Sequence, residues 1–143
     1  MTPIEFLSDS ARLYQDTVLP VCKKYGLTYM EFGVLMFLYN NPQYNTAAQI
    51  VSVRHIPKSH VSISVKSLIE KGLLRGEKCE DKRAVRLSVT ELAEEIARSG
   101  KSAQKNFTDK LFGGFSEAER SAFSVLLDKM ETNVAEHFDL KRS

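Results

Sequence analysis

The sequence lacks several features that define common protein classes. Its 143 residues include no tryptophan, two cysteines and four prolines. Cys22 and Cys79 alone cannot form a disulfide framework or supply a zinc site. The longest uninterrupted apolar run, residues 34–39, is far shorter than the roughly 20 residues that span a bilayer. Residues 1–5 have no basic stretch before an apolar core, so we expect a cytoplasmic protein with no membrane association.

The composition is that of an ordinary globular protein, with 43% hydrophobic and 27% charged residues. This balance excludes disordered, fibrous and collagen-like chains. At about 100–200 residues per domain, the length predicts one compact domain over residues 1–143.

The net charge of +2 is small, but it is unevenly distributed. Residues 54–86 contain nine Lys or Arg against four Asp or Glu, a net +5, while the rest of the chain, with 11 basic and 14 acidic residues, carries −3. A basic segment between acidic flanks is expected where one face meets a polyanion. A solvated charged loop would give the same pattern, and charge alone does not decide between the two.

Helical periodicity dominates the first half of the chain, where apolar residues recur every three or four positions. In the first helix, Pro20 is predicted to kink or restart the helix because proline lacks the amide donor, and Gly26 is predicted to end it. Thr28 and Glu31 form a capping box at the start of the second helix. The predicted helices cover residues 4–25, 28–39, a short segment after Thr46 whose inward side chains include Ala48, and residues 58–71, with a tight turn at 55–57.

The apolar period then changes to two over residues 73–78 and 84–88, which predicts a hairpin with a charged tip at 79–83. The predicted fold class is therefore mainly α (α+β), with a winged helix-turn-helix over residues 28–90.

Two further capping boxes mark the C-terminal helices. Ser88 with Glu91 is predicted to open a long helix that ends at Gly113-Gly114, and Ser116 with Glu119 is predicted to open the last helix.

The terminal segments, residues 1–26 and 91–143, each carry an apolar stripe that a domain of about 60 residues could hardly cover. We expect these helices to pack together and against a second copy of the chain, because a symmetric dimer is what a palindromic DNA site requires. The predicted dimerisation residues are Ile4, Leu7, Ala11, Tyr14, Leu127, Met130, Val134 and Phe138.

The helix over residues 58–71 has one apolar and one hydroxyl-rich, mildly basic face. At 100° per residue, Val61, Val65, Leu68 and Ile69 point inward, and Ser64 flanks the outward face. Ile63 lies at the centre of that face, where it could pack on a thymine methyl group, be a scattered surface residue or contact another subunit. The predicted DNA-contacting residues of this helix are Lys58, Ser59, His60, Ser62, Ile63, Lys66 and Ser67.

The hairpin tip supplies a second set of candidates, Asp81, Lys82, Arg83 and Arg86. A guanidinium at the end of a two-stranded ribbon can enter a narrow minor groove, and Asp81 could hold it extended. A solvated turn of the same composition would have no such role.

Three segments resemble the MarR family of transcription regulators. Residues 27–35 (LTYMEFGVL) are similar to its second-helix motif, residues 58–74 (KSHVSISVKSLIEKGLL) to its recognition helix, and residues 81–90 (DKRAVRLSVT) to its wing. Three positions depart from the family pattern: Ile63 stands where many members have Arg, Lys82 replaces the first Arg of the wing, and the glycine common soon after the Leu-Thr start is absent at Leu92-Ala93, which predicts a straighter start of the long helix. The first departure predicts a different base preference, and the second keeps the charge but loses bidentate geometry.

The resemblance implies an obligate homodimer that reads a pseudo-palindromic operator in double-stranded DNA. Such proteins mostly repress their own operon or a neighbouring one. Many release DNA when a small inducer, often phenolic, binds between the dimerisation and DNA-binding parts.

The cysteines and histidines are the other residues that could form functional sites. Cys22 is expected to be a small buried hydrophobe, and Cys79 could be exposed to oxidation beside the wing. The spacing of the histidines, His55, His60 and His137, is not that of a metal site. The sequence has no catalytic motif, so we expect neither enzyme activity nor a cofactor. The alternative function is a winged-helix module that contacts protein instead of DNA, since the fold alone does not dictate DNA binding.

Overall fold

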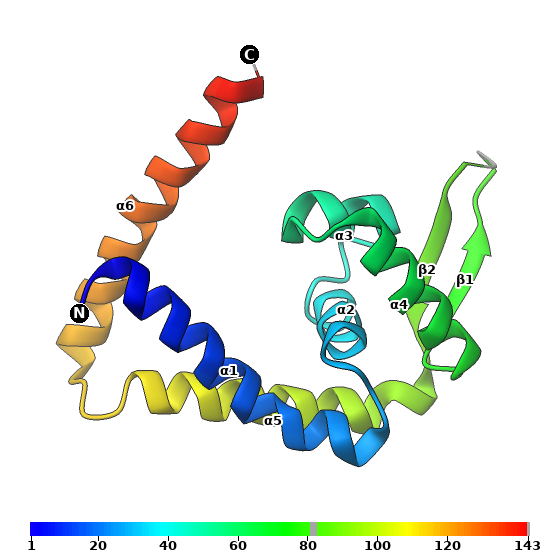
Figure 1. Cartoon of the computed structure of the whole chain (residues 1–143), viewed down its shortest axis with the longest axis horizontal. Helices are drawn as coiled ribbons and strands as arrows, with labels where there is room; N and C mark the ends of the chain where they lie inside the picture. The colour runs from blue at the N-terminus through cyan, green and yellow to red at the C-terminus, as the bar shows by residue number, and fades with distance from the viewer. Residues whose placement is uncertain (81–82, 143) are drawn as a thin grey trace. The chain divides into compact units, whose positions relative to one another are not determined.

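The computed structural model describes residues 1–80 and 83–142 of the chain (Figure 1). It divides into two compact units, Met1–Phe107 and Thr108–Ser143, which are described separately. The first unit contains the winged helix-turn-helix that the sequence predicts, together with the N-terminal helix and most of the long helix that follows the hairpin.

Helix α1 (Pro3–Tyr25) is continuous, so the predicted restart at Pro20 is wrong. A proline inside a helix costs about 3 kcal/mol. Burial of Val18 and Cys22 on either side of it offsets this cost. Gly26 ends the helix as predicted, in the left-handed conformation with φ 67°, which glycine adopts without strain.

Helices α2 (Tyr29–Asn40), α3 (Ala47–Arg54) and α4 (Lys58–Glu70) follow in the predicted order. The capping box of Thr28 and Glu31 is confirmed, and Thr46 with Gln49 forms another that the sequence analysis missed. The turn between α3 and α4 places His55 in the left-handed region, with φ 53°. Ala48 is exposed rather than inward-facing, because α3 buries Ile50 and half-buries the side chains near it.

Strands β1 (Leu74–Lys78) and β2 (Val85–Val89) form the predicted antiparallel hairpin, with Leu74 paired to Val89 and Lys78 to Val85. The predicted capping box of Ser88 and Glu91 is wrong. Ser88 lies inside β2, paired with Arg75. The Thr90 hydroxyl instead donates to the Gly72 carbonyl at 2.7 Å.

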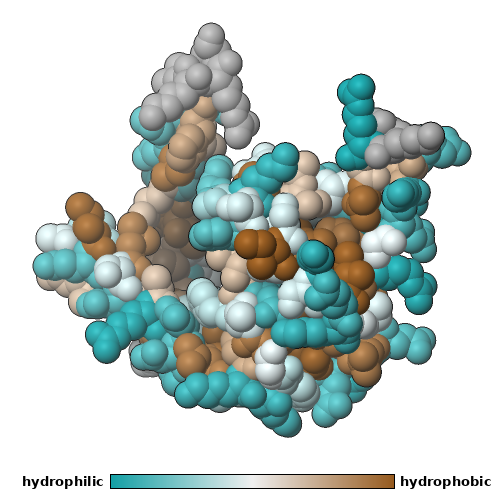
Figure 2. All heavy atoms as spheres, turned by 45° about the vertical axis from the view of Figure 1, so that its right-hand side comes forward, coloured by the Kyte–Doolittle hydropathy of each residue, from teal (hydrophilic) through white to brown (hydrophobic). Residues whose placement is uncertain are grey.

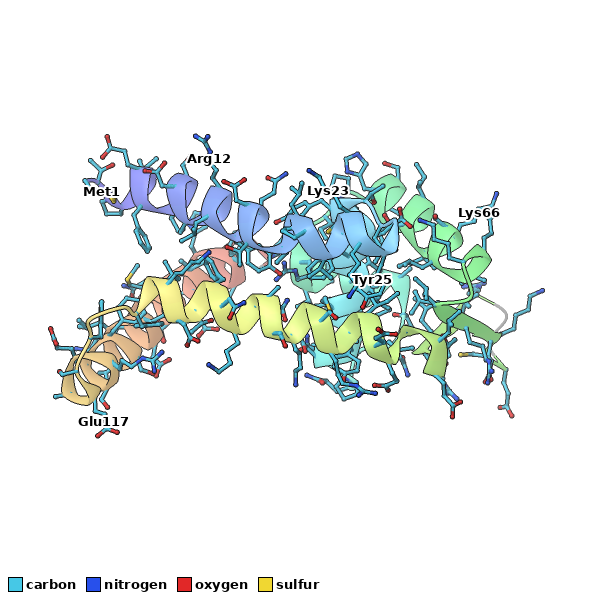
Figure 3. The ribbon with its side chains drawn as sticks, turned by 90° about the horizontal axis from the view of Figure 1, so that it is seen from below. Met1, Arg12, Lys23, Tyr25, Lys66 and Glu117 are labelled. Carbon is cyan, nitrogen blue, oxygen red and sulfur yellow. The ribbon has the colours of Figure 1, made fainter. Side chains whose placement is uncertain are left out.

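One 3-10 turn, η1 (Glu91–Ala93), then precedes helix α5 (Glu94–Leu111). Over the first unit, α5 runs antiparallel beside α1 (Figure 3). The Gln104 amide donates to the Tyr14 hydroxyl at 2.9 Å, and Tyr25 pairs with Ser99 at 3.2 Å. These contacts attach the N-terminal helix to the winged unit.

Two apolar clusters form the core of the first unit. One lies under the helix-turn-helix and hairpin and includes Leu35, Ile50, Val61, Leu68 and Leu87. The other joins α1, α2 and α5 through Val18, Phe32, Met36, Ala97 and Ala103.

Gly100 sits against the second cluster. A Cβ atom at this position would lie 2.5 Å from the Met36 sulfur and 3.0 Å from the Phe32 ring. A side chain at position 100 would therefore force the Met36 thioether to move.

The second unit contains the end of α5 and helix α6 (Glu117–Arg142). The predicted capping box is confirmed, since the Ser116 amide donates to Glu119 and the Glu119 amide to the Ser116 hydroxyl. Phe112, Phe115 and Phe123 pack edge to face around the bend between the helices.

Candidate nucleic-acid interface

One long face of α4 is exposed and carries the polar side chains that the sequence predicts. Val61 and Leu68 are fully buried and fix the helix on the core, so the opposite side of the helix faces outward. Ile63 is 69% exposed, which is unusual for a large aliphatic side chain. The other exposed candidates on this face are Lys58, Ser59, His60, Ser62 and Lys66.

Three residues of α4 lie differently from their predicted positions. Ser64 is 4% exposed rather than on the edge of the outward face, and Ile69 is 39% exposed rather than inward. Ser67 is half-buried, and its hydroxyl donates to Glu31 at 3.0 Å. A helical wheel assumes one buried and one exposed face. Helix α4 instead contacts three elements, α2, α3 and β1, so burial extends beyond a single face. We therefore leave Ser67 out of the proposed DNA-contacting set.

The partner of Ser67 is a buried carboxylate that the sequence analysis placed only in a capping box. Glu31 is 5% exposed and accepts hydrogen bonds from the Thr28 amide at 3.1 Å, Ser67, and Lys71 at 2.7 Å. Burial by itself raises the pKa of Glu31, but these donors outweigh it and hold the pKa below its ordinary value. The carboxylate is therefore charged at neutral pH.

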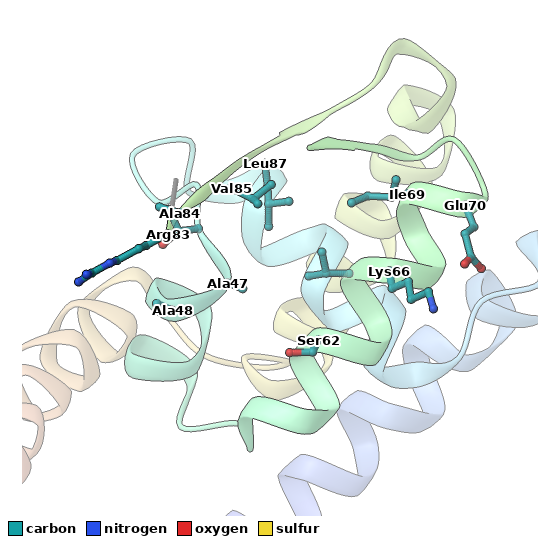
Figure 4. Close-up of a pocket in the computed structure, with 12 residues that line it drawn as sticks. Ala47, Ala48, Ser62, Lys66, Ile69, Glu70, Arg83, Ala84, Val85 and Leu87 are labelled. Carbon is teal, nitrogen blue, oxygen red and sulfur yellow. The ribbon is translucent and has the colours of Figure 1, made fainter. Parts of the chain in front are cut away.

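The hairpin presents its cations on different faces. Side chains alternate along a strand, so Val85 and Leu87 share one face of β2 and Arg86 lies on the other, directly across from Glu77. Val85 and Leu87 point toward Ile69 of α4, while Arg83 extends outward from the tip (Figure 4). The structure thus separates Arg86 from the α4 side of the ribbon. Asp81 and Lys82 lie outside the described residues.

A cleft of about 630 Å³ lies between α3, α4 and the hairpin. Apolar side chains line its floor and polar ones its edge, and the space-filling view shows exposed apolar side chains surrounded by polar ones beside the hairpin (Figure 2). Ser62, Lys66 and Arg83, which are candidate DNA contacts, also line this cleft.

The predicted dimerisation residues lie on α1 and α6, and most of them are exposed. Ile4, Leu7 and Ala11 are exposed on α1, and Leu127, Met130, Val134 and Phe138 are exposed on α6. Tyr14 is different, because it is half-buried and its ring packs edge to face on Phe107 at 5.2 Å. It therefore has a packing role within its own chain.

The cysteines and a possible metal site are the remaining candidates from the sequence. Cys22 is buried as expected, and burial raises the pKa of its thiol, which disfavours the reactive thiolate. Cys79 is partly exposed, and its amide donates to the Ala84 carbonyl at 3.1 Å. Within the described residues, no three His, Cys, Asp or Glu side chains gather as metal ligands. None of the helices that the structure describes is long and apolar enough to cross a bilayer.

The central part of this chain matches a known family. The family model for the MarR family matches residues 25–84, which run from the end of α1 to the hairpin tip. This segment contains α4 and the connections that position it.

Solved structures share the fold over nearly the whole chain. A putative MarR family transcriptional regulator from Listeria monocytogenes, complexed with a 26mer DNA, has a TM-score of 0.83 and 21% identity, covering 96% of this chain and 91% of that one. The transcriptional regulator SlyA has a TM-score of 0.83 and 18% identity, covering 98% and 99%. Bordetella bronchiseptica BpsR, whose DNA binding is regulated by 6-hydroxynicotinic acid, has a TM-score of 0.70 and 21% identity, covering 89% and 96%. The predicted winged helix-turn-helix fold is thus confirmed.

Proposed function

We propose that this protein, whose residues 25–84 match the model of the MarR family, is a transcription regulator of that family that binds a pseudo-palindromic operator as a homodimer and represses its own or a neighbouring operon. MarR-family members are transcription regulators, not enzymes, so the proposal includes no catalytic step. A small-molecule inducer that releases the operator, and action in the cytoplasm, complete the proposal.

The exposed face of α4 is the observation that carries this proposal. Small hydroxyl side chains allow a helix to approach the floor of the major groove closely, and Lys66 can reach a phosphate or a guanine edge. Arg83 extends from the neighbouring hairpin, where a minor groove would lie. The proposed DNA contacts are Lys58, Ser59, His60, Ser62, Ile63 and Lys66 of α4, and Lys82 and Arg83 of the hairpin tip with Asp81 as their support.

The test is a fluorescence anisotropy titration against the duplex upstream of the protein's own gene, at two salt concentrations and with random competitor DNA. We expect tight binding that survives competitor, with a salt slope of about 0.9 per phosphate contact. Equal, weak binding to both DNAs would contradict autoregulation. Loss of all specific binding, including to duplexes selected from a random pool, would favour the protein-binding alternative.

In the same assay, Arg83→Ala is expected to weaken operator binding by about 1–3 kcal/mol, because a groove contact is lost. Arg86→Ala is the matched control, since it removes the same charge from the face of the ribbon that is turned away from Val85, Leu87 and α4. We expect its effect to be several-fold smaller. Equal losses for the two variants would mean that the hairpin acts through its charge alone and that Arg83 does not enter a groove.

Ile63 is proposed to pack on a thymine methyl group. Ile63→Ser is therefore expected to reduce the preference for thymine at one position of each half-site, with about 1 kcal/mol less discrimination and a smaller change in total affinity. Selection of bound duplexes from a randomised pool would measure this preference. A uniform loss of affinity with unchanged base preference would assign Ile63 to another contact.

A further inference from the structure

Several helices of this chain have glutamate or glutamine at the same position, three residues after the N-cap. Glu5 and Glu119 occupy it at the starts of α1 and α6, where both are exposed and hydrogen bond within their own capping boxes. Gln49 occupies it at the start of α3 and makes the same local bonds without a charge. The capping box itself therefore requires neither burial nor a carboxylate.

Glu31 has the same local role but additional partners far away in the sequence. One carboxylate oxygen accepts from the Thr28 amide, and the other accepts from the Ser67 hydroxyl and the Lys71 ammonium group. The Lys71 ammonium group also donates to the Gly26 carbonyl at 2.9 Å. Together these bonds, which we call the Glu31 clamp, join the end of α1, the start of α2 and the last turn of α4.

The clamp holds α4 at two points. Ser67 and Lys71 are four residues apart, so they lie one above the other on the same side of the helix. Because both bind the same carboxylate oxygen, they restrict rotation of α4 about its axis as well as its tilt. At the other end of α4, the N-cap residue Pro57 supplies no side-chain hydrogen bond.

This rotation matters for the exposed face of α4. Lys66 is the neighbour of Ser67 in the helix, and Ile63 lies one turn earlier on the outward side. Rotating α4 about its axis by 100°, the angle between successive residues, would turn a different set of side chains outward. A small fraction of that rotation keeps the same side chains outward but changes the direction in which α4 presents them, and therefore its alignment with the α4 of the proposed second copy.

We propose that Glu31 is a positioning residue, which sets the orientation of α4 through Ser67 and Lys71 and thereby the spacing between operator half-sites that the dimer accepts. The inference rests on the proposed function. It adds that half-site spacing is determined by the ion pair between the buried Glu31 carboxylate and the partly exposed Lys71 ammonium group, which lies on the side of α4 that faces away from the DNA.

The substitution Glu31→Gln separates the clamp from the capping box. Glutamine retains the oxygen that accepts from the Thr28 amide, as Gln49 does at the start of α3. It places its amide NH₂ group against the Ser67 and Lys71 donors, where an acceptor is needed. Glu119→Gln is the matched control, because it makes the same change in an exposed capping box.

The test uses an operator selected from random duplexes with the wild-type protein. Binding is then measured to one half-site, to the full operator, and to operators with one base pair added or removed between half-sites. For Glu31→Gln we expect about wild-type affinity for the single half-site and about a tenfold loss for the full operator, the scale of one charge-assisted hydrogen bond. The preference for the native spacing should fall by a similar factor, and Glu119→Gln should change none of these values.

Lys71 provides a second route if Glu31→Gln does not fold. The Lys71 side chain is 38% exposed, so Lys71→Met is expected to fold and to reproduce the loss of spacing preference. Lys71→Arg keeps the charge and should restore it.

Two results would overturn the positioning role. One is an unchanged spacing preference in Glu31→Gln or Lys71→Met, and the other is an equal loss on half-site and full operator. Failure of the wild-type protein to select any duplex would instead overturn the proposed function, and this inference with it.

Discussion

Phe32→Ala is expected to lower the free energy of unfolding by about 3–5 kcal/mol, the usual range for removing a buried aromatic ring. Phe32 has no exposed surface and lies in the cluster that joins α1, α2 and α5. Its ring also borders Gly100 of α5, since a Cβ atom there would lie 3.0 Å from it. The loss is therefore expected to loosen the packing of α1 and α5 on α2.

Urea denaturation followed by circular dichroism measures this change, at one protein concentration because the proposed dimerisation would add to apparent stability. Phe115→Ala is the control, since Phe115 is 43% exposed, and it should cost about 1 kcal/mol or less. A loss of under about 1 kcal/mol for Phe32→Ala would mean that the α1–α2–α5 cluster is not close-packed.

The double substitution Met130→Glu with Val134→Glu is expected to lower operator affinity by about 100- to 10,000-fold, because it removes the avidity of two linked half-site contacts. Met130 and Val134 are four residues apart on α6, and they are 57% and 56% exposed. An apolar stripe of this size is expected to be covered by another surface. The proposed second copy would have to bury the two introduced carboxylates without partners.

Sedimentation equilibrium and the anisotropy titration together test this prediction. Ser121→Glu with Ala135→Glu adds the same charge to exposed residues of α6, about 140–180° around the helix from Met130 at 100° per residue. This control should remain dimeric and bind the operator as the wild type does. A dimer that survives the Met130 and Val134 substitutions would place the interface elsewhere.

Much of the fold could be predicted from local patterns. Capping boxes at Thr28 and Ser116, the glycine after α1 and the change of period at residue 73 each depend on neighbouring residues, and the structure has all of them. Ser88 shows the limit of this approach. Its spacing to Glu91 fits a capping box, but pairing with Arg75 across the hairpin keeps it in a strand.

The parts of the candidate site that could not be predicted depend on contacts between distant residues. Glu31 meets Ser67 and Lys71, which lie 36 and 40 residues away in the sequence. A capping box explains the type of residue at position 31, so nothing local indicates that its carboxylate has additional partners. Similarly, the count of basic residues says nothing of direction, and only the strand register shows that Arg86 lies across from Glu77, on the opposite face of β2 from Val85 and Leu87.

The alternation of side chains between the two faces of the hairpin also limits the insertions that the chain can tolerate during evolution. Adding a residue within β2 would exchange the faces of Val85, Arg86 and Leu87, placing a guanidinium against α4 and two aliphatic side chains in solvent. Adding residues between the strands, before Arg83, would lengthen the reach of the tip and leave both faces unchanged. Evolution can therefore vary the length of the tip in single-residue steps, whereas the paired strands admit changes only in twos.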